Sequence, residues 1–544
     1  MVLLMVALPT MGQDSSFEEF RQRQRAQFEQ FKTDKQDSYD LFRQRANTAY
    51  AEFMRKAWED FPVREGLVPF EEDEVPPMVY PDDAEPAETE NDEPEEPNND
   101  SIDEPAEPEN AEPEEPENDD SALVVSVGSE QSEHATNWSF SLPKFTNKPR
   151  EITVQPNVTV VPSAPPTPEP IAPVKPQPNI PTQSITVNYY GSTVTLGFPQ
   201  SDRLKLADLN EETLADAWQT LSGKAYDISV KTALDVRDGL QLCDWAYLDV
   251  LRALTEKQYG ATNEAVLMQA YLMTQTGYRI RLAKTQDRLF LLIASNYEIY
   301  RMRYVSADGV KYYITGDYNG ERLQLCRSKF DKEQSLSLQL ARLPKLKEEM
   351  TPKRTLTSKK GVTASVSVNK NLIAFFNQYP QANIDGDFAT RWAAYANTPL
   401  EKNVQDELYP TLRRTITSMK EREAVGILLN WVQTAFKYAY DNDVWGVDRA
   451  FFVQETLYYP QSDCEDRAIL FSRIVRDIVG LDVVLLYYPG HLATAVAFTN
   501  EEPGDWFMYN GRRYVVCDPT YINAPVGATM PGMDNKTAKI IVLK

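Results

Sequence analysis

Three residues in the C-terminal third of the chain have the types and the order that nucleophilic thiol catalysis needs. Cys464 precedes an apolar periodic run that predicts a helix, so it lies in a first turn, where free N–H groups and the helix dipole favour a thiolate. His491 opens a predicted strand, and Asp518 follows another one. An imidazole can take the thiol proton, and a carboxylate can hold the ring in one orientation. The sequence therefore predicts a Cys464–His491–Asp518 catalytic triad for acyl transfer.

The residues beside the predicted nucleophile oppose a thiolate. Asp463, Glu465 and Asp466 flank Cys464, and their charges would raise its pKa. The helix terminus supplies only ~0.3–1 kcal/mol, which is less than one pKa unit. The thiolate therefore needs protonated His491 as a partner, unless the carboxylates point away or bind a cation. Calcium at Asp463 and Glu465 is one alternative, and a solvated pair that caps the helix is the other.

The histidines and cysteines exclude most other metal sites. The chain has 2 histidines, and only His491 lies in the globular part, so a multi-histidine zinc site is excluded. The 4 cysteines show no CxxC spacing, which argues against a zinc ribbon and a dense disulfide framework. Cys243 and Cys326 would either pair or remain buried free thiols, and Cys517 is expected to be a core thiol. We expect no cofactor other than the calcium alternative.

Acidic residues are concentrated in one segment. The chain of 544 residues has a net charge of −25, and 24 acidic residues but no basic one lie between Glu71 and Asp120. The rest of the chain is close to neutral, which excludes the basic surface of a nucleic-acid-binding protein. No apolar run reaches the roughly 20 residues that span a bilayer, so we expect no integral membrane segment.

Composition divides the N-terminal part of the chain into three segments. Residues 1–12 resemble the apolar core of a signal peptide, which predicts export to the periplasm or cell envelope. Residues 15–62 contain paired aromatics that repeat every 11 residues, which predicts an amphipathic helix. Its aromatic face would fold onto the chain's own domain, self-associate or bind a protein partner. Residues 69–181 are acidic and then rich in proline, which predicts a disordered linker.

The motifs around the predicted triad resemble a known family. DCED at 463–466, PGH at 489–491 and YVVCDPTY at 514–521 are similar to motifs of the transglutaminase-like superfamily. This resemblance covers roughly residues 420–530. It implies a papain-like α+β fold, in which a helix packs on an antiparallel sheet, for a catalytic domain at 363–544. It also implies that the triad named above is catalytic.

The sequence offers several donors for an oxyanion. The backbone N–H of Cys464 is the first of them. The side chains of Gln454, Tyr459 and Gln461 precede the nucleophile. We prefer Gln461 as a supporting residue because it is closest to Cys464 in sequence.

The first globular segment, 184–340, repeats features of the second one, 363–544. When the two are aligned, the helix and the following strands match, and the nucleophile position falls on Ala261. The base position falls on Arg288, while the aspartate is kept as Asp317. The sequence therefore predicts a degenerate transglutaminase-like domain without a nucleophile or a base, kept for binding or regulation.

Two classes of function follow from these patterns. The first is an exported cysteine enzyme that attacks peptide or amide carbonyls of a protein or peptide substrate. Hydrolysis, as in a protease or amidase, is preferred to protein cross-linking because water is always available. The second class is a non-catalytic scaffold or binding protein of the cell envelope.

Overall fold

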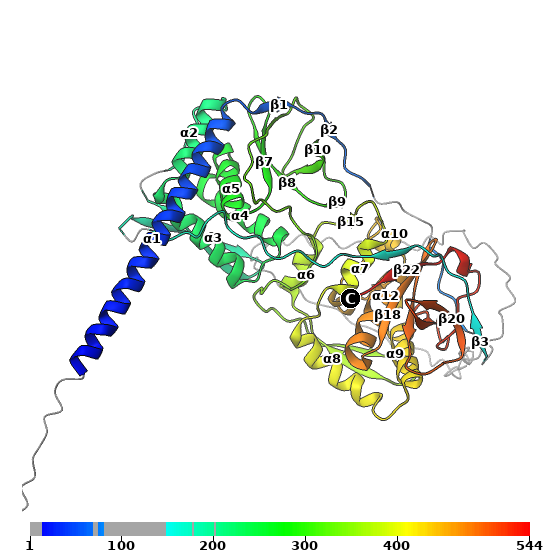
Figure 1. Ribbon diagram of the computed structural model, residues 1–544. Coiled ribbons are helices and arrows are strands. Elements are labelled where there is room, and N and C mark those ends of the chain that lie inside the picture. The colour runs from blue at the N-terminus through cyan, green and yellow to red at the C-terminus, as the bar shows by residue number, and fades with distance from the viewer. Residues whose placement is uncertain (1–13, 69–73, 81–147, 177–178, 201–202) are drawn as a thin grey trace, which may run out of the picture. The chain divides into compact units, whose positions relative to one another are not determined.

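The described part of the chain is a mixed helix and sheet structure with two seven-stranded sheets. The computed structural model describes residues 14–68, 74–80, 148–176, 179–200 and 203–544 (Figure 1). The predicted signal segment at 1–12 and most of the acidic run lie outside these residues. The described residues through Val79 and from Lys148 onward belong to one compact unit.

The first sheet is antiparallel throughout. Its inner strands β7 and β8 are buried along their whole length. One face packs on the helix α5 (Asn263–Gln275), and an apolar cluster that includes Phe290 and Val305 covers the other face. In spatial order the strands are β1 (Trp58–Asp60), β12 (Gln324–Cys326), β7 (Ile280–Lys284), β8 (Leu289–Ala294), β11 (Val310–Ile314), β10 (Tyr304–Ala307) and β2 (Val63–Arg64).

The second sheet has an antiparallel centre and a parallel strand at each edge. The helix α12 (Cys464–Ile474) packs on one face, and a cluster that includes Leu486 and Val516 covers the other. In spatial order the strands are β3 (Pro149–Glu151), β20 (Gly504–Tyr509), β21 (Arg512–Cys517), β19 (His491–Ala497), β18 (Asp482–Tyr488), β22 (Lys539–Val542) and β4 (Val158–Val160).

The five central strands of the two sheets follow the same order. The series β12-β7-β8-β11-β10 corresponds to β22-β18-β19-β21-β20, with the same sequence of hairpins. The edge strands differ, since β1 and β2 are antiparallel to their neighbours whereas β3 and β4 are parallel. All four edge strands precede the central strands of both sheets in the sequence. The two halves therefore share a central topology that preceding segments extend in different ways.

Side-chain caps begin several helices. The Asn210 side chain accepts from the N–H of Thr213 and begins α2, and Asn369 caps α6 in the same way. The helices not yet given are α1 (Asp14–Met54), α2 (Glu211–Leu221), α3 (Asp227–Gly239), α4 (Asp244–Tyr259), α6 (Lys370–Asn377), α7 (Thr390–Asn397), α8 (Lys402–Thr415), α9 (Glu421–Ala435), α10 (Asp441–Val444) and α11 (Val453–Tyr458).

Four short strand pairs complete the fold. The β9–β15 pair joins the two halves of the chain, because Tyr297 and Ile384 are register partners. A single apolar core then continues from the first half into the second. The pairs are β5 (Thr182–Tyr189) with β6 (Ser192–Pro199), β9 (Tyr297–Ile299) with β15 (Ala382–Ile384), β13 (Arg354–Thr357) with β14 (Thr363–Val366), and β16 (Lys437–Tyr438) with β17 (Gln461–Ser462).

The N-terminal helix ends earlier than the aromatic repeat predicts. The repeat predicts a helix over 15–62, but α1 ends at Met54, and β1 follows it as a strand. Strand β1 pairs with β12 at the edge of the first sheet. An open edge presents unpaired backbone groups, and strand pairing satisfies them.

The buried face of α1 packs on the helices of the first half. Asn47 is fully buried there, and its Oδ1 accepts from Trp218 Nε1 at 3.0 Å and from Gln275 Nε2 at 2.9 Å. The Tyr50 ring stacks on the Trp218 ring at 4.4 Å. Among the side chains of α1 that the structure describes, the buried ones are Arg43, Asn47, Tyr50, Ala51 and Met54.

The aromatic residues of the repeat do not share one environment. Tyr50 is buried, while Tyr39, Phe42 and Phe53 are exposed. The side chains of the earlier aromatics lie outside the described residues. The expected single aromatic face is therefore wrong for the described part of the helix, because the face that meets the domain combines one ring with Arg43 and Asn47.

The predicted linker at 69–181 is wrong at both ends. Residues 74–80 lie against the second half of the chain, and residues 148–176 lie along both halves, with β3 and β4 as edge strands. The proline-rich part is held through its carbonyls, as Arg237 Nη1 donates to Pro168 O at 3.0 Å. Proline keeps the chain extended, and the carbonyl oxygens of such a segment have no hydrogen-bond partner within it. Side chains of the domain can therefore donate to these oxygens without a β-sheet ladder. Residues 69–73, 81–147 and 177–178 of the predicted linker lie outside the described residues.

Candidate active site

Cys464 is the first residue of α12, as the sequence predicts. The helix begins with a capping box in which the Asp463 carboxylate accepts from Asp466 N–H and the Asp466 carboxylate accepts from Asp463 N–H, each at 3.3 Å. Cys464 therefore stands at the N1 position, where its backbone N–H has no intrahelical acceptor.

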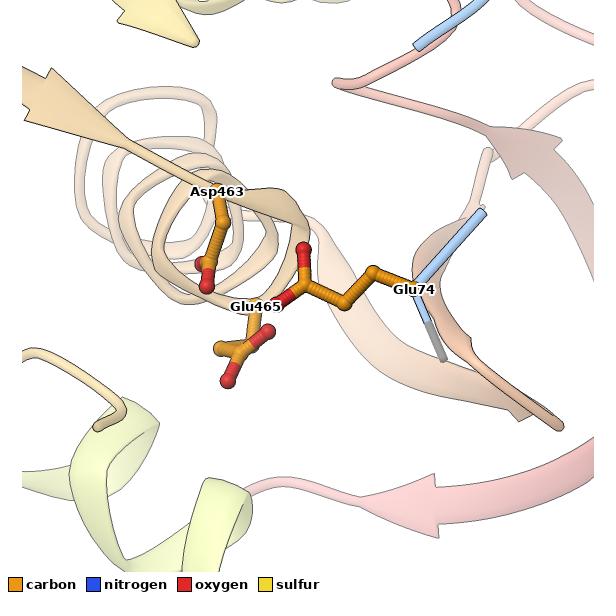
Figure 2. Close-up of side chains that lie close together, drawn as sticks. All are labelled: Glu74, Asp463 and Glu465. Atoms are coloured by element: carbon orange, nitrogen blue, oxygen red, sulfur yellow. The ribbon is translucent and has the colours of Figure 1, made fainter. Parts of the chain in front are cut away.

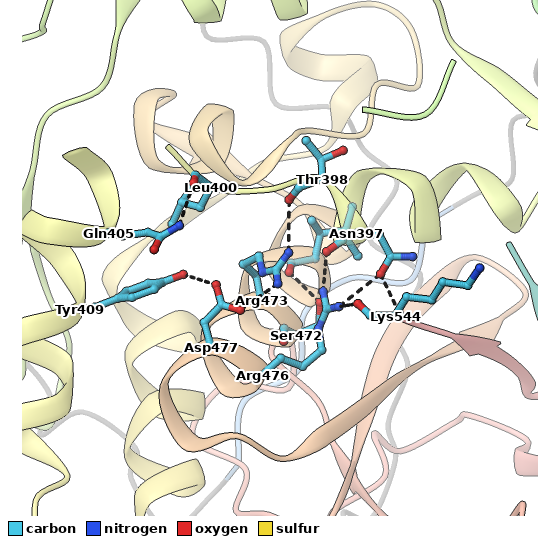
Figure 3. Close-up of polar contacts among 12 residues, drawn as sticks. Asn397, Thr398, Leu400, Gln405, Tyr409, Ser472, Arg473, Arg476, Asp477 and Lys544 are labelled. Carbon is cyan, nitrogen blue, oxygen red and sulfur yellow. Dashed lines mark hydrogen bonds and ion pairs between the residues drawn. The ribbon is translucent and has the colours of Figure 1, made fainter. Parts of the chain in front are cut away.

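The other end of α12 is fixed by charged side chains (Figure 3). Arg473 binds Asp477 at 2.8 Å, and Tyr409 donates to the same carboxylate at 2.6 Å. Arg476 donates to Asn397 Oδ1 at 3.2 Å and to the backbone oxygen of Lys544 at 2.5 Å. These contacts tie the helix to α7, α8 and the C-terminal residue, so the helix that presents Cys464 has a defined position.

His491 and Asp518 form a hydrogen-bonded pair. The β18–β19 hairpin turns at Gly490, which has a φ of 73°, and His491 is the first residue of β19. Its Nε2 lies 2.9 Å from Asp518 Oδ2. The other oxygen of Asp518 accepts from the N–H groups of Thr520 at 2.9 Å and Tyr521 at 3.1 Å. The carboxylate is therefore oriented by its own loop and in turn orients the imidazole.

Gln433 supports this loop, although the sequence motifs do not include it. This buried residue of α9 donates through Nε2 to the backbone oxygens of Asp518, Tyr521 and Ala524 at 2.9, 2.7 and 3.1 Å. The sequence signal for this role is the position of Gln433, a polar side chain on the otherwise apolar face of a predicted helix.

The sulfur and the imidazole line one small pocket. Cys464 is 3% exposed and His491 is 1% exposed. The Nδ1 atom of His491 is buried and has no hydrogen-bond partner. The pocket has a volume of about 50 Å³, which is room for a few waters but not for a peptide. The residues that line it are Glu74, Phe388, Arg391, Trp392, Asp441, Asn442, Asp448, Cys464, Glu465, Tyr487, Gly490, His491 and Leu492.

The thiol points to a carboxylate in this state. Cys464 Sγ donates to Glu465 Oε2 at 3.3 Å, and the backbone N–H of Leu492 binds the sulfur. Burial, with the nearby charges of Glu465, Asp463 and Glu74, raises the pKa of the Cys464 thiol well above its ordinary value. The resting sulfur is thus a neutral thiol, as the flanking acidic residues suggest.

An acidic cluster surrounds the sulfur, and the structure adds a member from outside the motif. Carboxylate oxygens of Glu74, Asp463 and Glu465 lie within 4.8 Å of one another (Figure 2). A second group consists of Asp441, Asp448 and Glu465. Burial and then the charge of Glu465 raise the pKa of Glu74 and that of Asp441 to about 8. The cluster therefore retains protons at neutral pH or needs a cation.

The side chains considered as oxyanion donors lie elsewhere. Gln461 is half-buried in β17, and Gln454 donates to Pro399 O at 3.4 Å. Tyr459 donates to Asn377 Oδ1 at 2.8 Å. The described lining of the pocket includes none of the three. Tyr438 pairs with Ser462 across β16 and β17, and burial, followed by the charge of a Cys464 thiolate, raises the pKa of its hydroxyl.

In the first half of the chain, Asn263 takes the place at the start of α5 that Cys464 takes at the start of α12. The N–H of Leu289 donates to Asn263 Oδ1 at 2.8 Å, as the N–H of Leu492 binds the sulfur of Cys464. Asn263 is also the first residue of α5. The first residues of α5 and α12 thus differ by two residues from the alignment that matches Ala261 with Cys464, and α12 is followed by a π-helical turn, Val475–Val479.

In the first half, Arg288 and Asp317, which the sequence alignment matches with His491 and Asp518, make a different kind of contact. Arg288 Nη1 donates to the backbone oxygen of Asp317 at 2.7 Å, where His491 and Asp518 are joined through a carboxylate. Both Arg288 and Asp317 are exposed. An arginine keeps its proton and cannot act as a base, so this arrangement lacks the chemistry of a triad.

All four cysteines are buried free thiols. Cys243 and Cys326 therefore do not pair, and the alternative of two buried thiols is confirmed. Cys517 is fully buried in the core of the second sheet, as expected.

No protein-family model matches the chain, and no curated protein matches it either. Among the described residues, no helix has both the length and the apolar character needed to cross a membrane.

Proposed function

We propose that the chain is a cysteine acyl-transfer enzyme of the transglutaminase-like type, with a papain-like catalytic half. The observation that supports this most strongly is the geometry of His491. Its Nε2 is bound to Asp518, while its Nδ1 is unpartnered in the pocket that Cys464 lines. An imidazole that is oriented on one side and unbound on the other is prepared to take a proton.

The proposed mechanism uses only residues of this pocket. The thiol rotates from Glu465 to His491, Nδ1 takes its proton, and the sulfur attacks the carbonyl carbon of a peptide or amide. The backbone N–H of Cys464 stabilises the negative charge that develops on the carbonyl oxygen of the substrate. His491 then returns the proton to the leaving amine, and water attacks the thioester. In a cross-linking reaction a lysine amine would take the place of water.

The test is product formation by the full-length protein. Candidate envelope proteins are incubated with the wild type, with Cys464→Ala and with Cys243→Ala, and mass spectrometry follows new termini and new isopeptide bonds. We expect cleavage by the wild type and by Cys243→Ala, whose substitution removes a buried thiol outside the proposed site, and none by Cys464→Ala. New isopeptide bonds would identify a cross-linking enzyme instead.

A non-catalytic envelope scaffold is the second candidate. The closed pocket favours it, because a peptide cannot reach the sulfur in the described state. No product from any substrate, together with saturable binding of an envelope protein by the Cys464→Ala variant, would favour this function. Export itself is tested by the location of the protein after cell fractionation.

A role for calcium is the remaining expectation about the site. Asp463 Oδ2 is buried without a hydrogen-bond partner and belongs to the Glu74–Asp463–Glu465 group, and a hard cation binds such oxygens. Activity that survives a chelator unchanged would dispose of it.

The shared strand order of the two sheets supports the inference that the first half is a degenerate copy. A copy with Asn263 and Arg288 in place of the thiol and the imidazole is suited to binding, and the exposed aromatics of α1 offer a surface for a partner or for self-association. Sedimentation of the wild type against Phe42→Glu tests self-association.

A further inference from the structure

A segment from the N-terminal part of the chain lies along the mouth of the pocket. The N–H of Val75 donates to the backbone oxygen of Gly490 at 3.0 Å, and the N–H of Ile522 donates to that of Met78 at 2.6 Å. Val79 and Ile522 form a parallel bridge. Gly490 precedes the base and Ile522 follows Asp518 by four residues, so the segment runs from the histidine hairpin to the aspartate loop.

The first side chain of this segment enters the pocket. Glu74 lines the pocket together with Cys464, and its Oε2 accepts from the Tyr438 hydroxyl at 3.0 Å. Figure 2 shows the Glu74 side chain reaching toward Asp463 and Glu465 at the start of α12. The segment thus covers the sulfur and also binds a hydroxyl donor beside it.

We propose that residues 74–80 occupy in cis the groove that takes an extended peptide substrate, and that they close the active site as an autoinhibitory strap. This inference rests on the proposed function for the identity of the substrate. The contacts of Val75 and Met78 use the backbone, which any extended peptide can supply. The prolines Pro76 and Pro77 keep the segment extended before it binds, which lowers the entropy lost on docking.

The near-complete burial of the two reacting groups agrees with closure. Cys464 and His491 are almost without exposure, and the pocket has room only for a few waters. A carbonyl reaches the sulfur only after a part of the lining moves. The strap enters that lining through Glu74, is held by a few backbone bonds at the rim, and does not belong to the sheet or to α12.

The electrostatic surroundings of the Glu74 carboxyl are unfavourable, so a substrate can displace the strap. Its carboxyl lies within 4.8 Å of carboxylate oxygens of Asp463 and Glu465. A peptide with lysine, arginine or an amide at this place would fit the same seat better. The titratable and charged groups around Glu74 include Asp441, Asp448, Asp463, Glu465, Cys464, Tyr438, Tyr440, Arg391 and His491.

The test measures access to the sulfur in the full-length protein. Iodoacetamide modifies the protein, and mass spectrometry follows the peptide that contains Cys464 over time. Val75→Pro removes the N–H that binds Gly490, and Glu74→Lys places a cation among the acids. We expect alkylation to become at least tenfold faster in Val75→Pro and several-fold slower in Glu74→Lys. Val79→Ala, at an exposed side chain, is the control and should match the wild type.

A peptide added in trans tests the groove itself. A synthetic peptide with the sequence of residues 73–81 should protect Cys464 of Val75→Pro, and the same peptide with lysine at the Glu74 position should protect it at a concentration at least tenfold lower. Rates that agree within twofold across Val75→Pro, Glu74→Lys and the wild type would overturn the strap, as would a Cys464 that reacts in none of them.

These readouts do not require turnover, so the two proposals can fail separately. Accelerated alkylation in Val75→Pro without any product would support the autoinhibitory strap and contradict the proposed enzymatic activity. Product formation that neither substitution changes would support the enzymatic activity and contradict the strap.

Discussion

At the scale of single residues, the site combines an oriented imidazole–carboxylate pair with a buried thiol that is bound to another carboxylate. Asp518 is fixed by two backbone N–H groups and binds His491, whose other nitrogen is unpartnered. Cys464 instead donates its proton to Glu465, and burial raises its pKa. Because Cys464, Glu465 and His491 line one pocket, the proposed mechanism requires a change of partner for the sulfur rather than a rebuilding of the site.

Substitution of Asp518 tests the orientation of the imidazole. Asp518→Asn keeps the shape of the side chain but presents a different hydrogen-bond pattern to His491 Nε2, which favours the wrong tautomer. We expect kcat/KM for a cleaved substrate to fall about 10³–10⁴-fold. Glu423→Gln changes an exposed acid on α9 and is the control. A decrease of less than tenfold in Asp518→Asn would contradict an orienting role.

The pH dependence of access to Cys464 follows from Glu74. Burial raises the pKa of Glu74 from 4.5 in the free strap to about 8 in the seated one. The seated state therefore binds the proton more tightly, so its stability is complete below pH 4.5 and declines as the pH rises toward 8.

We expect the rate of Cys464 alkylation to rise more steeply with pH in the wild type than in Glu74→Gln. The thiol ionises in both proteins, so the ratio of the two rates isolates the carboxyl of Glu74. A ratio that stays constant between pH 5 and pH 8 would show that this carboxyl does not control the strap.

At the scale of elements, helices gain their positions from buried polar contacts as much as from apolar faces. The helix α12 is fixed by a capping box at one end and by arginines at the other. The helix α1 meets the first half through Arg43 and Asn47 as well as Tyr50. Buried polar groups tolerate little displacement because an unpaired group is costly. These contacts therefore set the register of each helix.

Asn47 provides the test for α1. Asn47→Leu removes the acceptor of Trp218 Nε1 and Gln275 Nε2, which both remain buried. We expect the free energy of unfolding to decrease by about 2–4 kcal/mol, measured by urea denaturation. The control is Gln44→Leu at an exposed position of the same helix, with an effect within about 0.5 kcal/mol. Equal effects of the two substitutions would mean that the helix is not docked through Asn47.

At the scale of the whole molecule, distant segments complete each half. Strands β1 and β2 close the first sheet, β3 and β4 close the second, and one apolar core extends through both halves. A globular part defined as residues 184–544 would therefore leave four strand edges open.

Truncation tests this dependence. A fragment of residues 184–544 should unfold at a midpoint lower than that of the full chain by at least about 5 °C in a thermal scan. Deletion of residues 90–138, which lie outside the described residues, keeps all four edge strands and should leave the midpoint unchanged. A fragment as stable as the full chain would show that the edge strands contribute little.

Local patterns in the sequence by themselves determined much of the site. The residues Cys464, His491 and Asp518 could be predicted because each stands at the start or end of an element with a clear apolar period. The acidity around the sulfur was also readable, since Asp463 and Glu465 are its chain neighbours. Periodicity and capping act over a few residues, so they leave a signal in a short stretch of sequence.

The tertiary structure decided what depends on contacts between distant segments. It placed Glu74 against the start of α12 and Gln433 under the Asp518 loop. It also turned parts of a proline-rich, acidic stretch into edge strands and a strap, although composition predicts a disordered linker there. The physical reason is that such a segment buries little apolar surface of its own. Its order comes from backbone groups paired with a partner that is hundreds of residues away.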